Sequence, residues 1–308
     1  MRIAVLGNLG SWYVDALTSA ARARGHESER LDYGALTARV GAIRTGTGSE
    51  EPAGTENDID SPLGRLSRWD AVIVRTMPPG SLEQVVFRMD ALHRLERAGV
   101  TILNPPRGIE CAVDKYLTTS RLAAEGLPVP ATKVCEGFEQ AMNAFETLGR
   151  DVVVKPVFGA EGRGILRVSD VDMAHRVFRT LERLQAVLYL QRFVRHPGYD
   201  IRVLVLDGRP IGAVRRINPD DFRTNVSRNA RAETHDATDR EIEFALRAAR
   251  CTDARFAGVD LLYDERGELF VIEVNAVPGW RAFERTTGIP VADRVIESLE
   301  RTRDVQST

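Results

Sequence analysis

The spacing of hydrophobic positions divides the chain into two parts of different character. In the first hundred or so residues, short apolar runs at 1–6, 71–74 and 100–103 alternate with segments of helical spacing at 15–24 and 82–98. Such runs predict buried strands, and the 3.6-residue spacing predicts amphipathic helices. Strands that alternate with helices are typical of a parallel α/β domain. A further short strand is predicted at 31–33.

The rest of the chain follows a different order of elements. Helices are predicted at 114–125, 170–184 and 238–249, and strands at 151–157, 164–168, 187–194, 201–206, 210–216, 258–263 and 268–274. The Asp207-Gly208 step and the turn at 265–267 predict two hairpins. Antiparallel hairpins flanked by helices indicate α+β architecture. The predicted fold class is therefore α/β followed by α+β.

The segment 41–65 interrupts these patterns. It is rich in Gly, Ser, Thr, Pro and acidic residues and has no hydrophobic periodicity. That composition predicts a mobile surface loop. A chain of 308 residues is long enough for two or three domains.

Composition excludes several classes of protein. The chain is 43% hydrophobic and 28% charged, with a formal net charge of −2, which gives no support for a nucleic-acid or membrane-surface partner. Its three cysteines are widely spaced and predict neither a disulfide framework nor a metal knuckle. The apolar run 3–6 is too short for a signal peptide, and no stretch is long enough to span a membrane. We expect a cytoplasmic enzyme.

The hairpin near the end of the chain carries the most informative polar residues. Strand alternation directs Ile272 and Val274 toward the core and Glu273 and Asn275 to the opposite face. If the hairpin turns at its Arg-Gly step, Asp260 pairs with Glu273. Hard oxygen donors of this kind suit Mg²⁺, which shares its shell with substrate phosphates. The alternative is a surface hairpin whose acidic side chains face water.

A lysine and a glycine-rich loop follow one another earlier in the chain. Lys155 ends an apolar strand, where an ammonium group needs an anionic partner. The alternative is that the lysine side chain extends along the strand end and places its ammonium group in water. Gly159, Gly162 and Gly164 then allow the backbone to approach phosphates closely. The loop matches neither a Walker A sequence nor a dinucleotide fingerprint. An ordinary hairpin turn is the alternative explanation.

Several arginines lie around the turn at 218–221. Arg215, Arg216 and Arg223 flank it, and Arg202 lies in the strand expected to pair with the same hairpin. Guanidinium groups present a rigid donor fork to phosphates and carboxylates. The alternative is a solvated charged rim.

Taken in order, these pieces resemble the ATP-grasp superfamily and, within it, the RimK-type α-L-glutamate ligases. The resemblance covers roughly residues 105–300. The stretches that carry it are Asp114-Lys115, Val153-Val154-Lys155, the glycine loop, Leu190 to Val194, Asp200-Ile201-Arg202, Asp221 to Asn225, Ala257 to Asp260, Ile272 to Gly279 and Glu284 to Ile289.

The resemblance implies an ATP-grasp fold behind a Rossmann-like pre-ATP-grasp domain. The expected domains are an N-terminal α/β domain over residues 1–104, a central subdomain with the glycine-rich loop over 105–186, and a C-terminal subdomain with the metal site over 187–308.

The resemblance also implies roles for individual residues. Adenine is expected between two antiparallel sheets, with its edge at the backbone of 191–194, and the ribose near Asp200. The residues expected to bind ATP are Lys115, Lys155, Gly159, Gly162, Gly164, Gln191, Arg192, Phe193, Val194, Asp200, Arg202, Arg223 and Asn225. Arg215, Arg216 and Arg223 are expected to act in catalysis, and Asp260, Glu273 and Asn275 to hold Mg²⁺, for which Mn²⁺ is expected to substitute. The family often has Glu at the position of Arg192, a change that leaves backbone contacts intact.

The implied reaction is ATP-dependent ligation of an amine to a carboxylate through an acylphosphate. The expected amine is L-glutamate, and the expected acceptor is a small molecule, of pterin or furan type, or a protein C-terminus. A homo-oligomer, dimer or tetramer, is expected. The alternatives are a ligase for another amino acid, as in lysine or dipeptide synthesis, and a catalytically silent nucleotide-binding regulator. A Rossmann-type dehydrogenase is suggested only by residues 5–10, which lack the full glycine spacing.

Overall fold

The structure is a computed structural model that describes residues 1–41, 58–159, 163–219, 221–224 and 230–306. These residues form two compact units, and each is described by itself. Unit 1 comprises Met1–Arg107 together with Pro290–Thr308, and unit 2 comprises Gly108–Ile289. The predicted order of α/β followed by α+β is confirmed. Most of the predicted loop 41–65 lies outside the described residues.

Unit 1 is built on a four-stranded parallel sheet with the strand order β2-β1-β6-β7. Its elements are β1 (Arg2–Leu6), α1 (Trp12–Ala23), β2 (Glu27–Leu31), β6 (Ala71–Val74), α2 (Leu82–Arg97), β7 (Thr101–Leu103) and α9 (Val291–Gln306). The apolar run from Ile3 to Leu6 is fully buried, as its composition requires. Helix α2 begins where Ser81 and Gln84 form a capping box.

Two details of unit 1 differ from the sequence-based expectation. The second strand is β2, and residues 33–35 form a short 3₁₀ helix (η1, Tyr33–Ala35) because the Asp32 side chain accepts a hydrogen bond from the backbone of Gly34 at 2.8 Å. The end of the predicted loop also forms strands. β4 (Asp58–Ser61) pairs with β3 (Thr37–Arg39) and β5 (Gly64–Arg65), and η2 (Leu66–Arg68) follows.

The last helix of the chain, α9, belongs to unit 1, whereas it was expected in the C-terminal subdomain. A charged contact ties it to the parallel sheet. The Arg24 guanidinium donates to Glu300 at 3.0 and 2.6 Å, and His26 Nε2 lies 2.8 Å from the same carboxylate. The hydrogen bonds from Arg24 lower the pKa of Glu300 to about 2. These partners are far apart in sequence, so local patterns do not reveal the contact.

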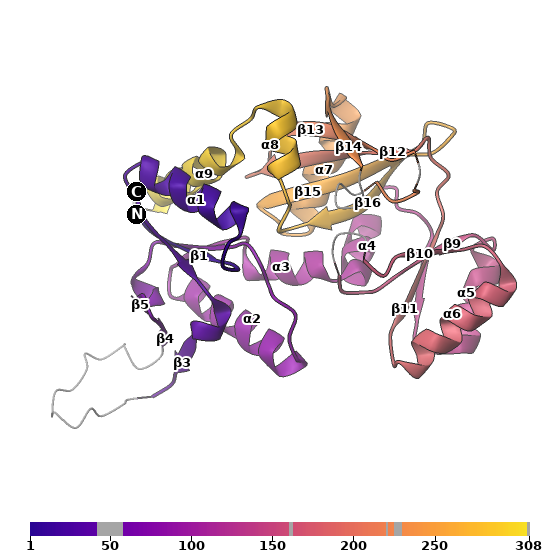
Figure 1. Ribbon diagram of the computed structural model, residues 1–308, viewed down its shortest axis with the longest axis horizontal. Coiled ribbons are helices and arrows are strands. Elements are labelled where there is room, and N and C mark those ends of the chain that lie inside the picture. Colours follow the sequence, from indigo (N-terminus) through magenta and orange to yellow (C-terminus); the bar gives the residue numbers. More distant parts are fainter. Residues whose placement is uncertain (42–57, 160–162, 220, 225–229, 307–308) are drawn as a thin grey trace. The chain divides into compact units, whose positions relative to one another are not determined.

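Unit 2 contains two antiparallel sheets (Figure 1). The central sheet has the order β10-β9-β11-β8, and α5 and α6 cover one face of it. Its elements are β8 (Thr132–Cys135), α5 (Phe138–Thr147), β9 (Val152–Lys155), β10 (Leu166–Val168), α6 (Val171–Arg183) and β11 (Leu188–Arg192). Because β11 pairs with both β9 and β8, this sheet continues past residue 187, where the C-terminal subdomain was expected to begin.

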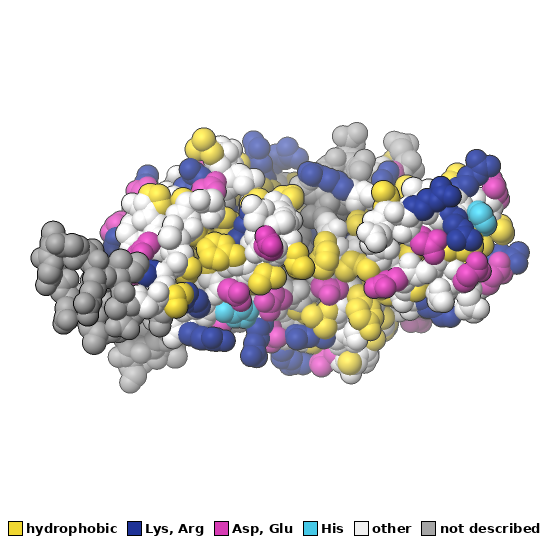
Figure 2. Space-filling model, turned by 90° about the horizontal axis from the view of Figure 1, so that it is seen from below, with side chains coloured by type: hydrophobic (Ala, Val, Ile, Leu, Met, Phe, Trp, Pro, Cys, Tyr) yellow, Lys and Arg dark blue, Asp and Glu magenta, His cyan; other side chains and the backbone are white. Residues whose placement is uncertain are grey.

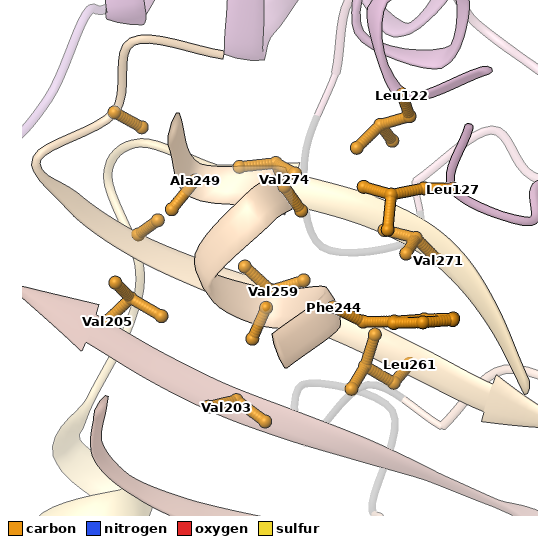
Figure 3. Close-up of a cluster of buried hydrophobic side chains, with 14 of the residues drawn as sticks. Leu122, Leu127, Val203, Val205, Phe244, Ala249, Val259, Leu261, Val271 and Val274 are labelled. Carbon is orange, nitrogen blue, oxygen red and sulfur yellow. The ribbon is translucent and has the colours of Figure 1, made fainter. Parts of the chain in front are cut away.

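The second sheet of unit 2 has five strands in the order β14-β13-β12-β15-β16. The strands are β12 (Tyr199–Leu206), β13 (Arg209–Ile217), β14 (Arg231–His235), β15 (Phe256–Tyr263) and β16 (Leu269–Asn275). The helices are α3 (Pro106–Val113), α4 (Lys115–Ala124), α7 (Asp239–Cys251) and α8 (Arg281–Thr287). Figure 3 shows Phe244 of α7 against Val259 and Leu261, with Leu122 and Leu127 beside Val271. This core fixes one face of the sheet, so the polar residues of the strands gather on the other.

The surface agrees with the small net charge. Lys and Arg side chains lie intermixed with Asp and Glu over the face drawn in Figure 2. Among the described helices, none combines the length and apolar character that crossing a bilayer requires.

Candidate active site

A pocket in unit 2 is lined by residues of both sheets and of helix α4. The central sheet contributes Val153, Lys155, Tyr189 and Gln191, whereas the core side chains that alternate with them, such as Val154, pack under α5 and α6. The five-stranded sheet contributes the residues Asp200, Arg216, Asp260, Leu262 and Glu273. The pocket encloses about 1080 Å³ of empty space, part of it open to solvent.

Two lysines lie at one end of the pocket. Lys155 ends β9, and its Nζ donates to Gln191 Oε1 at 2.7 Å. Burial lowers its pKa to about 8, which the negative charge of Glu273 opposes. Lys115 is the first residue of α4, where the Asp114 side chain caps the helix. Its Nζ donates to the Gly159 carbonyl at 2.6 Å and lies 3.8 Å from a Glu273 oxygen.

The glycine-rich loop meets the pocket at Gly159. This residue has φ = 147°, which a side chain would strain, and its carbonyl is the one that Lys115 binds. Gly164 has φ = 72° but does not line the pocket. Gly162 lies outside the described residues.

Opposite charges pair across the strands of the five-stranded sheet. Asp200 on β12 faces Arg216 on β13, and Arg202 on β12 faces Asp260 on β15. Arg216 Nε donates to Asp200 Oδ1 at 2.7 Å, and its Nη2 donates to Asp200 Oδ2. Arg202 donates to both carboxylate oxygens of Asp260, from Nε to Oδ1 at 2.7 Å and from Nη2 to Oδ2 at 2.8 Å. Arg216 Nη2 also lies 2.9 Å from Asp260 Oδ2. All the charged groups of this ladder are therefore satisfied by one another.

This ladder keeps Asp260 ionised. The residues Asp260 and Arg216 are each 3% exposed, so burial alone would raise the pKa of Asp260. The guanidinium groups of Arg202 and Arg216 outweigh that effect and lower it.

The expected register of the metal hairpin is confirmed, because Asp260 lies directly opposite Glu273. Two carboxylates facing each other on neighbouring strands repel unless a cation lies between or beside them. Asn275 follows on β16, with its Oδ1 accepting a hydrogen bond from Val277 N at 2.8 Å. Among the described residues, no three His, Cys, Asp or Glu side chains form a metal-binding group. Asp260 and Glu273 line the pocket and Asn275 does not. The two carboxylates are hard oxygen donors that fit Mg²⁺.

The expectation that Ile272 faces the core is wrong. The pairing of β15 and β16 shifts between Asp260 and Leu261, which leaves Ile272 as the extra residue of a β-bulge. Val271 and Val274 face the core, three positions apart, and both Ile272 and Glu273 line the pocket.

Comparison with known proteins identifies the family of the chain. The profile of the RimK-like ATP-grasp domain matches residues 112–299. The chain belongs to the RimK-like ATP-grasp family. It is accordingly a ligase that uses ATP.

Relatives of this ligase match it over nearly the whole chain. It is 32% identical to the tetrahydromethanopterin:alpha-L-glutamate ligase of Methanosarcina acetivorans, over 94% of this chain and 95% of that protein. It is 33% identical to the ribosomal protein bS6–L-glutamate ligase of Escherichia fergusonii, over 98% and 96% of the two chains.

Solved structures share the fold of the ligase. The ATP-grasp ligase PsnB with its minimal precursor has a TM-score of 0.75 at 24% identity, over 98% of this chain and 99% of that one. PsnB with its precursor, Mg and ADP has a TM-score of 0.70 at 23% identity, over 97% of this chain and 98% of that one.

The pocket of the ligase gathers most of the residues expected to bind ATP. Those that line it are Lys115, Lys155, Gly159, Gln191, Arg192, Phe193, Val194, Asp200 and Arg223, and the pocket is also lined by Arg216, expected in catalysis, and by Asp260 and Glu273, expected to hold metal. Arg223 is held by Asp221, which accepts from its Nη2 at 2.6 Å. Arg202 does not line the pocket but donates to Asp260, which does. Asn225 lies outside the described residues.

Arg215, expected to act in catalysis, is not in the pocket wall. It alternates with Arg216 along β13 and lies opposite Ile201, a residue of the core on the α7 face. Its guanidinium lies 4.7 Å from the ring centre of Tyr199. Strand alternation cannot direct both neighbouring arginines to one face, so the catalytic expectation for Arg215 is corrected.

Several pocket residues of the ligase were not predicted. Phe222 and His196 lie against Phe193, with ring centres 5.9 and 6.0 Å apart, and Arg167 stacks 3.7 Å from the same ring. The other lining residues that were not predicted are Ala112, Thr118, Thr119, Pro130, Val153, Pro156, Arg163, Ile165, Tyr189, Thr224, Leu262, Ile272 and Val274. Alternation with Gln191 could have indicated Tyr189, because the two share a face of β11. The aromatic cluster joins β11 to later loops and has no local signal.

Proposed function

We propose that this ligase joins the amine of L-glutamate to an acceptor carboxylate. The acceptor is a small molecule, of pterin or furan type, or a protein C-terminus. The observation that carries the proposal is the pocket itself, in which two lysines lie beside a pair of opposed carboxylates. Relatives named as glutamate ligases act on tetrahydromethanopterin or ribosomal protein bS6, and they support glutamate as the amine.

The chain's own residues would perform the first half of the reaction by positioning. Lys115 and Lys155 would contact the ATP phosphates, and the backbone of β11 and the residues after it would bind the adenine edge between the sheets. A carboxylate has too poor a leaving group to react with an amine, so the γ-phosphoryl group is transferred to it first. Arg216 and Arg223 line the pocket and would offset the charge that develops during transfer.

Asp260, Glu273 and Asn275 would hold Mg²⁺, for which we expect Mn²⁺ to substitute. Bound there, the ion neutralises phosphate oxygens. Arg202 and Arg216 would keep the Asp260 carboxylate oriented and ionised.

In the second half of the reaction, the amine displaces phosphate from the acylphosphate and an amide forms. The acylphosphate must be kept from water. The glycine-rich loop, tied at Gly159 to Lys115, is suited to cover it. A homo-oligomer, dimer or tetramer, is part of the proposal.

Mass spectrometry of products tests the proposal most directly. Incubation with ATP, Mg²⁺ and L-glutamate should add one or more glutamyl residues to a pterin-type or furan-type acid or to a peptide ending in a free carboxylate. ADP release compared across amino acids distinguishes glutamate from another amine, such as a lysine-pathway or dipeptide substrate. If no amino acid and no acceptor produces ADP, the enzyme proposal fails and a silent nucleotide-binding regulator becomes the better explanation.

A further inference from the structure

The ammonium group of Lys155 has a neutral hydrogen-bond acceptor. Its Nζ donates to Gln191 Oε1 at 2.7 Å, and among the described residues no carboxylate forms an ion pair with it. This contrasts with Lys115, which lies 3.8 Å from a Glu273 oxygen. An ammonium group has three donors, and the amide uses one of them. The charge of Lys155 is therefore held in place without being neutralised.

The Gln191 amide has one orientation in this network. Its Nε2 donates to Thr132 Oγ1 at 3.0 Å and to Tyr189 Oη at 3.2 Å. Thr132 already donates its only hydroxyl hydrogen to the Pro130 carbonyl at 2.8 Å, so toward Gln191 it can only accept. The nitrogen of the amide must therefore face the hydroxyl groups, and its oxygen must face Lys155.

The network continues to helix α4. Because Tyr189 accepts from Gln191, its own hydrogen is available for Thr119 Oγ1, 2.8 Å away. Tyr189 and Gln191 are 1% and 3% exposed, so neither side chain can turn toward bulk water. Lys155 and Thr132 lie on the strands to either side of β11, which places the amide between them. The acceptor that Lys155 uses is thus fixed by three elements of the fold.

We propose that Gln191 is a positioning residue for ATP, which holds Lys155 at the phosphate end of the pocket while leaving its positive charge available. The inference rests on the proposed function, in which Lys155 contacts the phosphates. A glutamate of the same shape at this position would supply a negative charge, pair with the lysine and compete with phosphate. An apolar side chain of similar length would release the lysine stem.

The test measures ATP affinity in Mg²⁺ with no acceptor and no amino acid, so that it does not depend on the identity of either. At neutral pH, Gln191→Glu should weaken ATP binding at least tenfold in a chain that circular dichroism shows to be folded. Gln191→Met should weaken binding by a smaller factor. The pKa of Lys155 is about 8 beside the neutral amide. A carboxylate at 191 should therefore move the alkaline loss of ATP affinity to higher pH, which a merely structural role would not do.

Two further variants separate the possible failures. Lys155→Met should weaken ATP binding, and Gln191→Glu added to it should have no further effect, because the two residues act as a unit. If Lys155→Met binds ATP normally, the proposed role of Lys155 fails together with the inference. If Lys155→Met weakens binding but Gln191→Glu binds within twofold of the native chain with an unchanged pH profile, the inference alone is overturned. Gln140→Glu on the exposed face of α5 is the matched charge control.

Discussion

On the central sheet, the pocket face carries Lys155, whose acceptor is an uncharged amide. On the five-stranded sheet, the same pocket is lined by Asp200, Arg216 and Asp260, each of which meets an opposite charge at hydrogen-bonding distance. Buried charges that are paired give the structure a specific geometry, whereas a buried charge without a counter-charge costs stability and favours a ligand that supplies one. One wall of the pocket is thus organised for rigidity and the other for binding.

Glu273 lies where these two arrangements meet, because it faces Asp260 on one side and Lys115 on the other. Glu273→Gln should lower the rate of ADP release on the order of 100-fold, as loss of a group that organises transition-state charge does. Its unfolding free energy should change by no more than about 1 kcal/mol, because a like-charge pair is relieved. Steady-state kinetics and denaturant unfolding measure the two effects. Glu268→Gln, at an exposed position on the same hairpin, should change neither.

Removing one member of the charged ladder should instead lower the stability of the fold. Arg216→Met leaves Asp200 and Asp260 buried without their shared partner, which should cost about 3–5 kcal/mol of unfolding free energy. Arg202→Met should cost less, since Asp260 keeps Arg216. Chemical denaturation of both variants makes the comparison. Equal and small losses would mean that the ladder does not stabilise this sheet.

The pH dependence should sharpen the contrast between the two walls. The pKa of Lys155 is lowered from 10.5 to about 8 by burial, so between these values the unfolded chain binds more protons than the folded one. Without nucleotide, the contribution of this group to stability should rise with pH across that interval. ATP affinity should fall over the same interval, because the lysine loses its charge. Between pH 7 and 10, the contribution of Lys155 to the unfolding temperature without nucleotide should therefore rise, while the ATP affinity measured by titration should fall.

The smallest effect is expected on the far face of the five-stranded sheet. Arg215→Met removes a cation–π contact with Tyr199, worth about 0.5–1 kcal/mol at sites of this kind. ATP affinity should be unchanged, because Arg215 does not line the pocket. A tenfold loss of ATP affinity in this variant would contradict the assignment of the two arginines to opposite faces.

The pair Arg215 and Arg216 illustrates what the sequence could and could not reveal. Alternation along a strand requires the two to point apart. The register set by the Asp207-Gly208 turn would put Asp200 opposite Arg215, but an irregularity between Leu204 and Val205 shifts the pairing by one residue and brings Arg216 opposite Asp200. The prediction that Asp260 lies opposite Glu273 is confirmed, but the turn alone does not produce this pair: nearer the turn Leu261 pairs with Val271, and the bulge at Ile272 brings Glu273 opposite Asp260. The strand β8 was missed because its four residues, from Thr132 to Cys135, mix polar and apolar side chains without alternating burial.

The two ends of the chain show the same limit on a larger scale. Helix α9 is amphipathic in sequence, yet its place in unit 1 depends on Arg24 and His26, more than 270 positions away. Domain boundaries predicted from sequence assume that each domain is one continuous segment. Here the last segment of the chain, Pro290–Thr308, belongs to the same unit as the first.

The bulge at Ile272 allows the apolar wall of the pocket to change separately from the acidic pair. An extra residue in one strand is absorbed locally, so deleting Ile272 would restore simple alternation and leave Glu273 opposite Asp260. The apolar surface beside the nucleotide could then be trimmed or rebuilt without moving the acidic pair. Within this short strand, the shape of the wall and the placement of charge can vary separately during evolution or in engineering.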